Sequence, residues 1–375
     1  MTWIRDNLLK IAIILGVLII IIIIVSLFAP GGKKTDAVEA SGYEEIENKM
    51  QSAAINFLND NKNFLPSSSD KSTTIKLETL EKNRYIGSVY AIEDSSVKCK
   101  GEVVINKTSD DTKDYRIVPY ISCGKYYTTR KIKDYILDNE KIVTSDDGLY
   151  KEGDIYRFKG EYPNNYILLG ERKYRIISIQ PDGSLKLMRI LKTNSCYIWD
   201  DRYNSEVKKS IGINNYEKSR MKDNLYFILN NNDPEKGSVE LSNEEKTYFL
   251  NHEFCNGALD VHSNEISVAN ECKTTITQRI GLANPSDYYL ASVDSACTKM
   301  KMPECTNYNY MNKYDRLVLM NLPTNYSYRY LYLENSSLFS IDANRGNKLT
   351  IFVYIDGDNV YKSGNGTNDN PYVIR

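Results

Sequence analysis

The sequence predicts an α+β protein made of an N-terminal transmembrane helix, a small helix-plus-antiparallel-sheet module and a loop-rich α+β domain. Three observations support this fold class. A charge-free apolar run covers residues 11–29, a helical pattern and two strand-like segments lie within residues 43–137, and strands with many turn residues dominate residues 155–375. The 375 residues suffice for one membrane span and two modest domains.

The apolar run contains "GVLIIIIIIV", and a helix over residues 11–29 would span roughly 28 Å, close to a bilayer core of roughly 30 Å. The run ends in "SLFAP", which is a poor cleavage site for a secretory signal. We therefore predict an uncleaved signal-anchor at residues 8–29 in contact with membrane lipid, a cytoplasmic stub at residues 1–7 and a flexible stalk at residues 30–42. The alternative is the spine of a pilin subunit, although the glycine and glutamate of a pilin leader are missing.

The chain has seven cysteines, and none lies in a CxxC motif. Their spacing favours three disulfides, which we predict to be Cys99–Cys123, Cys255–Cys272 and Cys297–Cys305. Three bridges indicate an oxidising compartment. We therefore expect a single-pass protein of the cell membrane, with its N-terminus inside and its later domains outside the cell. For the remaining Cys196 we expect a buried free thiol, with an intermolecular bridge as the alternative.

The small module is predicted to cover residues 43–137. Within "YEEIENKMQSAAINFLND" apolar residues recur at steps of three and four, which predicts a helix. We expect "PSSSDKSTT" to be a loop and "IKLETLEKNRYIG" to be a short helix that runs into a turn. A helix on a small antiparallel sheet resembles the extracellular modules of pilin-like proteins.

The sheet of this module is predicted from "CKGEVVIN" and "YRIVPYISC", which are separated by a polar turn. If Asn106 and Asp114 flank the turn, the numbers of paired residues sum to about 220. Cys99 then faces Ile121, two residues from Cys123, and a small stagger brings the two sulfurs within reach of a bridge.

Residues 138–154 are polar and are predicted to be a linker to the domain at residues 155–375. The segments "IYRFKG" and "NNYILLGERKYRIISIQPDGSLKLMRI" predict strands, with a turn at "PDG". "YEKSRMKDNLYFILNN" predicts an amphipathic helix, and "SNEEKTYFL" predicts a helix capped by serine. Short strands follow at "YRYLYLE" and "LTIFVYI".

Six segments support a family resemblance, and they occur in this order: "GLYKEGDIYRFKGEYPNNYILLGERKYRIISIQPDGSLKLMRI", "IWDDRYN", "GINNYEKSRMKDNL", "RIGLANPSDYYLASVDSACT", "CTNYNYM" and "GNGTNDNPYVI". Together they resemble a group of uncharacterised bacterial membrane-anchored surface proteins. The C-terminal domains of that group look like distant relatives of the C-type-lectin-like and formylglycine-generating-enzyme fold. The resemblance covers roughly residues 148–375 and implies a C-type-lectin-like domain, with no activity to carry over. Where a tryptophan-rich strand is usual, this chain has "YDRLVLMN".

No catalytic residue is predicted. His252 and His262 could pair with Cys255, or form a zinc site with Cys255 and Cys272, but bridged cysteines and surface histidines are the simpler interpretation. The stretch "DGDN" offers oxygen ligands for calcium, although an Asp-Gly turn explains it better. We therefore expect no cofactor, with calcium as the open possibility. The acidic residues are too scattered to nominate a glycosidase pair.

Tyrosine is abundant, with 30 residues. Aromatic faces beside amides suit the recognition of sugars or peptides, and the residues predicted to bind a ligand are Tyr308, Asn309, Tyr310, Tyr326, Tyr328 and Tyr330. Two alternatives remain open: an AT-rich genome raises the tyrosine content, and alternating tyrosines also occur in ordinary strand packing.

The net charge of −1 and the lack of a basic stripe argue against nucleic-acid binding. The sequence therefore predicts a non-catalytic, membrane-anchored extracellular binding protein, either an adhesin or a module that recognises a cell-surface glycan or protein. The alternative is a structural pilin-like or envelope-assembly subunit. A third hypothesis is an enzyme of the formylglycine-generating type, although the copper-binding cysteine pair of those enzymes has no counterpart here.

Overall fold

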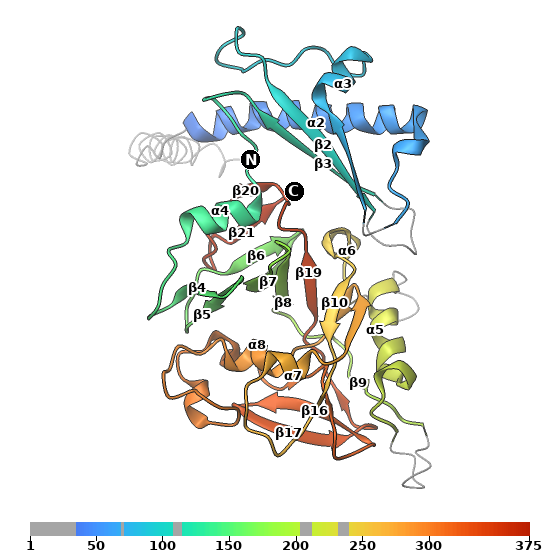
Figure 1. Cartoon of the computed structure of the whole chain (residues 1–375), viewed down its shortest axis with the longest axis vertical. Coiled ribbons are helices and arrows are strands. Elements are labelled where there is room, and N and C mark those ends of the chain that lie inside the picture. Colours follow the sequence, from blue (N-terminus) through green and yellow to red (C-terminus); the bar gives the residue numbers. More distant parts are fainter. Residues whose placement is uncertain (1–34, 69–70, 108–114, 203–211, 232–239) are drawn as a thin grey trace, which may run out of the picture.

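The computed structural model describes residues 35–68, 71–107, 115–202, 212–231 and 240–375 (Figure 1). The chain is α+β and consists mostly of strands. The predicted fold class is wrong in its transmembrane helix, because no helix within these ranges is long and apolar enough to cross a membrane. The sequence of the longest described helix, "TDAVEASGYEEIENKMQSAAINFLND", includes six acidic residues. The predicted span at residues 8–29 lies outside the described residues.

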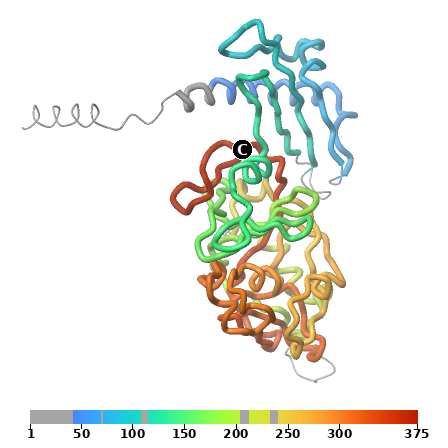
Figure 2. Tube along the Cα trace, turned by 60° about the vertical axis from the view of Figure 1, so that its left-hand side comes forward, coloured from blue at the N-terminus to red at the C-terminus, as the bar shows by residue number. Residues whose placement is uncertain are grey.

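The N-terminal module is one long helix packed across an antiparallel sheet of three strands (Figures 1 and 2). In chain order its elements are α2 (Thr35–Asp60), η1 (Lys62–Phe64), β1 (Ser72–Lys76), α3 (Leu77–Lys82), β2 (Lys100–Lys107) and β3 (Tyr115–Ser122). The predicted apolar stripe of the helix is buried against the sheet and includes Met50, Ala53, Ala54, Phe57 and Leu58. Packing of this stripe is the main stabilisation of the helix, since mixed sequences of this kind form weak isolated helices.

Three details of the module differ from the prediction. The helix begins at Thr35, inside the range 30–42 that was expected to be a flexible stalk. Residues Ser72–Lys76 were expected to lie mostly in a loop, but they pair with β2 and bury Ile75. Asn106 pairs with Arg116, so the numbers of paired residues sum to 222 (106 plus 116), not about 220.

This change of register brings the first disulfide into place without a stagger. Lys100 pairs with Ser122, so the next residues outward, Cys99 and Cys123, lie opposite each other. Their Cα atoms are 4.2 Å apart and their sulfurs are bonded. Both cysteines are buried in the module core.

The C-terminal domain is built around a nine-stranded sheet in the order β13-β19-β8-β7-β6-β21-β20, from which β5 and β4 extend beside β7. In chain order the domain begins with α4 (Ile132–Asn139), β4 (Gly148–Glu152), β5 (Ile155–Lys159), β6 (Tyr166–Leu169), β7 (Arg172–Ile179) and β8 (Leu185–Arg189). There follow β9 (Tyr197–Ile198), η2 (Tyr216–Lys218), α5 (Arg220–Asn230), α6 (Asn243–Tyr248), β10 (His252–Cys255), β11 (Ala258–Leu259), α7 (Val268–Glu271), β12 (Thr275–Gln278), β13 (Ile280–Gly281) and α8 (Pro285–Tyr289). The next elements are η4 (Pro303–Thr306), η5 (Tyr310–Lys313), β14 (Leu317–Val318), β15 (Leu322–Pro323), β16 (Arg329–Glu334), β17 (Ser337–Asp342), β18 (Gly346–Asn347) and β19 (Phe352–Ile355). The chain closes with β20 (Tyr361–Ser363) and β21 (Tyr372–Ile374).

Two hydrophobic cores lie on opposite faces of this sheet. In β7, Ile176 belongs to one core and its neighbour Ile177 to the other, and Leu187 and Met188 divide in the same way in β8. Successive strand residues point to opposite faces, so this alternation shows that the sheet is covered on both sides. All five residues of β8 are accordingly buried, although two of them, Lys186 and Arg189, are charged.

The boundary between the two modules lies earlier than predicted. Ile132 and Ile136 of α4 pack into the core of the C-terminal domain, although the N-terminal module was expected to extend to residue 137. Residues 138–154, predicted to be a linker, contain β4, which pairs with β5 along its whole length.

Most predicted elements of the C-terminal domain are confirmed. The strands of residues 164–190 form β6, β7 and β8, and Gly183 adopts φ +85° in the turn between the last two. The serine cap of α6 is present as a capping box, in which Ser242 and Glu245 each accept the other's backbone N–H. The predicted amphipathic helix forms α5, which buries Met221, Leu225 and Ile228.

Polar contacts join the two modules where the last strands pass beneath α2 (Figures 1 and 2). The Tyr120 hydroxyl on β3 donates to the backbone carbonyl of Asp358, and Lys131 pairs with the Asp358 carboxylate at 2.6 Å. Lys362 pairs with Glu44 on α2 at 3.1 Å, and Arg375 pairs with Glu47. The side chains of β3 that point away from α2 therefore face the C-terminal domain.

Candidate functional site

The first candidate site is a depression of about 620 Å³ beside the Cys297–Cys305 disulfide. We call it the Tyr308 depression. The predicted ligand residues Tyr308 and Asn309 both line it, and its full lining is Glu161, Asp294, Thr306, Asn307, Tyr308, Asn309, Asn312 and Lys313. The surface is polar with one prominent aromatic side chain, because the Tyr308 side chain is 59% exposed.

The backbone of Tyr308 is strained. Its φ is +44°, a left-handed conformation that is uncommon for a residue with a bulky side chain. The next residue holds this geometry in place. Asn309 is buried, and its side-chain amide donates to the carbonyls of Tyr288 and Cys305 at 2.9 and 2.8 Å. The hydrogen bonds of Asn309 and the Cys297–Cys305 disulfide thus hold this loop in place.

A carboxylate and an amide form the polar part of the Tyr308 depression. The Asn307 amide donates to the Asp294 carboxylate at 2.8 Å. This bond, followed by one from the Ala296 backbone N–H, holds the pKa of Asp294 below its usual value. Asp294 is therefore ionised at neutral pH and can accept further hydrogen bonds from hydroxyl groups of a ligand.

A second exposed aromatic side chain lies close by. The ammonium of Lys313 sits 3.9 Å from the centre of the Tyr162 ring, which is 68% exposed. The backbone of Tyr162 is anchored by Asp147, whose carboxylate accepts the N–H groups of Glu161 and Tyr162 at 2.7 and 2.9 Å. Both rings thus stand on backbone that is fixed by side-chain hydrogen bonds.

The structure does not place all the predicted ligand residues at this site. Tyr310 is fully buried with its ring 4.5 Å from the Arg175 guanidinium, and Tyr330 stacks on Trp199 in the other core. Tyr326 and Tyr328 are half-buried and pack edge to face with each other. The Tyr310 and Tyr330 rings are therefore buried core residues and offer almost no surface to a ligand.

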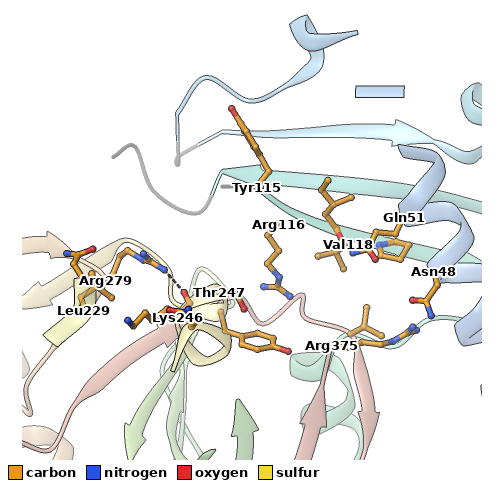
Figure 3. A pocket seen from close by; sticks show the side chains of 16 residues that line it. Asn48, Gln51, Tyr115, Arg116, Val118, Leu229, Lys246, Thr247, Arg279 and Arg375 are labelled. Carbon is orange, nitrogen blue, oxygen red and sulfur yellow. Dashed lines mark hydrogen bonds between the residues drawn. The ribbon is translucent and has the colours of Figure 1, made fainter. Parts of the chain in front are cut away.

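The second candidate site is a cleft of about 690 Å³ between the two modules (Figure 3). We call it the interdomain cleft. The N-terminal module supplies α2 and β3, and the C-terminal domain supplies α5, α6 and the chain end. The lining residues are Asn48, Gln51, Tyr115, Arg116, Ile117, Val118, Pro119, Leu229, Asn230, Asn243, Lys246, Thr247, Tyr248, Arg279, Val360 and Arg375.

The interdomain cleft is electrostatically one-sided. Four of its lining residues are basic, and the described residues that line it include no Asp or Glu. The whole chain is balanced, with 48 Lys and Arg against 49 Asp and Glu. Burial, and then the neighbouring Arg279, lower the pKa of Lys246. This concentration of positive charge in one cleft is a local feature that overall composition does not reveal.

The histidine, zinc and calcium interpretations receive no support from the geometry. Cys255 and Cys272 form a disulfide, so neither sulfur can serve as a nucleophile or a zinc ligand. The Nε2 atom of His252 lies 3.0 Å from a carboxylate oxygen of Asp182, which accepts a hydrogen bond from it, and the imidazole ring stacks on Tyr354. In the "DGDN" stretch the Asp358 carboxylate is held by Lys131 and Lys133, which compete with a cation for its oxygens.

Cys196 differs from the prediction. It is the free cysteine of the described residues, as expected, but it is exposed and not buried. It directly precedes β9 and lies beside Gly346 of β18, the strand that pairs with β9.

Neither candidate site was identified completely from the sequence. Asp294 and Asn307, which lie in loops, and Lys313, at the end of η5, were missed, because only the fold brings them to the Tyr308 depression. Arg116 was also missed, yet a signal existed: in "YRIVPYISC" large residues occupy both alternating sets. A strand with large residues on both faces predicts a second layer over the sheet.

Comparison with known proteins leaves the family resemblance a prediction. No protein-family model, curated protein or solved structure matches the chain.

Proposed function

We propose that this protein is a non-catalytic binding protein that works in an oxidising compartment outside the cytoplasm and recognises a carbohydrate at the Tyr308 depression. The three disulfides support the compartment, because such bonds persist where thiols are not kept reduced. The compartment in turn favours ligands displayed on cell surfaces, among which carbohydrates are prominent.

The observation that carries the proposal is the exposed, strained Tyr308 on a fixed loop. A polar surface seldom fixes an exposed aromatic ring in an unfavourable backbone conformation without a use for it. Here the strain is held by the buried Asn309 and by the Cys297–Cys305 bridge. A ring that is fixed before binding loses little conformational entropy when a ligand arrives.

The chemistry around Tyr308 matches a sugar ring. One face of a pyranose presents C–H groups, which pack on an aromatic ring, while its edges present hydroxyls that both donate and accept. The Asp294 carboxylate accepts, and the amides of Asn307 and Asn312 line the same depression. An ionised carboxylate beside amide groups is able to hold two neighbouring hydroxyls.

A glycan microarray probed with the full chain tests this proposal. We expect the wild-type protein to bind a restricted set of glycans. Tyr308→Ala and Asp294→Ala should each weaken that binding by about tenfold or more, because each removes one side of the site. Tyr226→Ala is the matched control, since Tyr226 is also exposed, at 69%, but lies on α5, outside the lining of the Tyr308 depression.

Two results would contradict the carbohydrate proposal. One is the absence of any glycan bound by the wild-type protein, and the other is equal binding by wild type and Tyr308→Ala. Self-association in chemical crosslinking together with no glycan binding would favour a structural subunit, for which the packing of α2 across a small sheet is the supporting observation.

A further inference from the structure

The Arg116 side chain is in an unusual environment. It projects from β3 into the interdomain cleft (Figure 3), and its atoms Nη1 and Nη2 are both buried without a hydrogen-bond partner in the described part of the chain. A guanidinium has five N–H donors and does not lose its proton in proteins. A buried cation with unsatisfied donors is costly, so most such groups have a partner.

The strand geometry explains how Arg116 reaches this position. Tyr115, Ile117 and Ile121 pack with the core under α2, so the alternate residues Arg116, Val118 and Tyr120 point to the other face of the sheet. Tyr120 on that face contacts the backbone of Asp358 in the C-terminal domain. Arg116, four residues earlier, lies over the cleft and has the Tyr248 ring 5.7 Å from its Cζ atom.

The neighbouring acidic groups do not satisfy Arg116. Burial lowers the pKa of Arg116, and the charges of Asp356 and Asp358 offset this from a distance. Asp358 is itself bound by Lys131 and Lys133, both at 2.6 Å. Glu47 on α2 is paired with Arg375. Each of these two carboxylates therefore has a basic partner other than Arg116.

The other basic residues of the cleft make the electrostatic potential around Arg116 more positive. Lys246 is 8% exposed, and Arg279 donates to the backbone carbonyls of Lys246 and Phe249. These contacts fix the Arg279 side chain at the cleft wall opposite β3, where Figure 3 also shows Lys246. A negative group placed beside Arg116 would also be attracted by the charges of Lys246 and Arg279, in a partly desolvated space where such attraction is strong.

We propose that the interdomain cleft is a second binding site of this protein, for a small ligand that carries a phosphate or carboxylate group, and that Arg116 binds this group. A planar guanidinium and an oxyanion form paired, charge-assisted hydrogen bonds. The volume of about 690 Å³ exceeds that of a bare oxyanion. The neutral Asn48, Gln51 and Asn243 on the lining suit hydroxyl groups on the rest of the ligand.

Isothermal titration calorimetry with the full chain tests the proposal, using glycerol phosphate, glycerate and glycerol as probes, none of which has a sugar ring that the Tyr308 depression would bind. We expect one or both anions to bind and neutral glycerol not to bind. Whichever anion binds more tightly identifies the phosphate or the carboxylate as the natural group. Raising the NaCl concentration should weaken binding, because salt screens the attraction between charges.

Arg116→Met separates a binding role from a structural one. Methionine keeps an apolar stem of similar length and removes a buried charge, so the variant should unfold at the same or a higher temperature. Its affinity for the anion should fall by about tenfold to a hundredfold. The matched control is Arg172→Met on the exposed end of β7, which should bind as wild type does.

Lys246→Gln provides a second variant, which should bind the anion more weakly while keeping the Arg116 contact. The proposal is overturned if neither anion binds the wild-type protein, or if Arg116→Met binds as tightly as wild type. A large loss of stability in Arg116→Met would also overturn it, because the guanidinium would then be stabilising the fold. None of these results depends on the Tyr308 depression.

Discussion

At the scale of single residues, Glu271 is a buried acid with an altered ionisation. Its side chain is 1% exposed and accepts hydrogen bonds from the backbone N–H and the hydroxyl of Ser286, at 2.9 and 2.5 Å. Burial raises the pKa of Glu271 from 4.5 to about 7, and the two Ser286 bonds only partly oppose this. Glu271 stands directly before Cys272, so it lies under the Cys255–Cys272 bridge.

This raised pKa predicts a pH-dependent stability. Between pH 4.5 and about 7 the folded protein keeps the Glu271 proton, whereas the unfolded chain has lost it. The free energy of unfolding should therefore fall as the pH rises through this window, by up to about 1.4 kcal/mol per pH unit from this residue. Glu271→Gln resembles the protonated acid and should remove that slope.

Urea denaturation of wild type and Glu271→Gln at pH 5 and pH 8 measures the effect. The variant should gain stability relative to wild type as the pH rises. Glu265→Gln serves as the control, because Glu265 is exposed and its replacement should leave the slope unchanged. A parallel pH dependence of Glu271→Gln and wild type would show that Glu271 ionises normally in the folded state.

At the scale of elements, the disulfides have different tasks. Cys99–Cys123 joins the ends of a β-hairpin across 24 residues and lies in a core. Cys297–Cys305 closes a loop of 8 residues at the Tyr308 depression. The entropy of loop closure gives about 3.5 kcal/mol for the first bridge and about 2.5 kcal/mol for the second. The first bridge thus mainly stabilises its module, and the second mainly fixes a recognition loop.

Two double variants should show this division of tasks. Replacing Cys99 and Cys123 by alanine should destabilise the N-terminal module and leave glycan binding unchanged. Replacing Cys297 and Cys305 should cost less stability but weaken glycan binding, since the Tyr308 loop loses its brace. Urea denaturation followed by circular dichroism, together with the glycan array, checks both. Loss of glycan binding in the first variant alone would contradict the assignment.

The elements that the sequence predicted correctly are those with strong local signals. The apolar stripe of α2, the capping box at Ser242 and the turn at Gly183 all depend on neighbouring residues. The predicted register of the β2–β3 hairpin was wrong: the numbers of paired residues sum to 222, not about 220. The reason is that the sequence of residues 108–114, between the strands, does not fix where the turn is centred. The strand Ser72–Lys76 was missed because its partner β2 lies far along the chain.

At the scale of the whole molecule, the interdomain cleft could not be predicted. Its basic residues come from β3, α6, the segment before β13 and the chain end, and only the fold brings them together. The net charge of −1 conceals them. The expected linker at residues 138–154 also suggested two independent modules, whereas Lys131, Lys362 and Arg375 form ion pairs between them.

The central claim is that this is a binding protein of an oxidising compartment, with three disulfides, one of which fixes its recognition loop. Peptide mass spectrometry of the protein from its native cells, alkylated without reduction, tests this claim most directly. We predict intact Cys99–Cys123, Cys255–Cys272 and Cys297–Cys305 bridges, and alkylation at the exposed Cys196 alone. Alkylation of Cys255 and Cys272, above all with a retained metal ion, would show that this bridge is absent. It would contradict both the oxidising compartment and the disulfide-fixed structure.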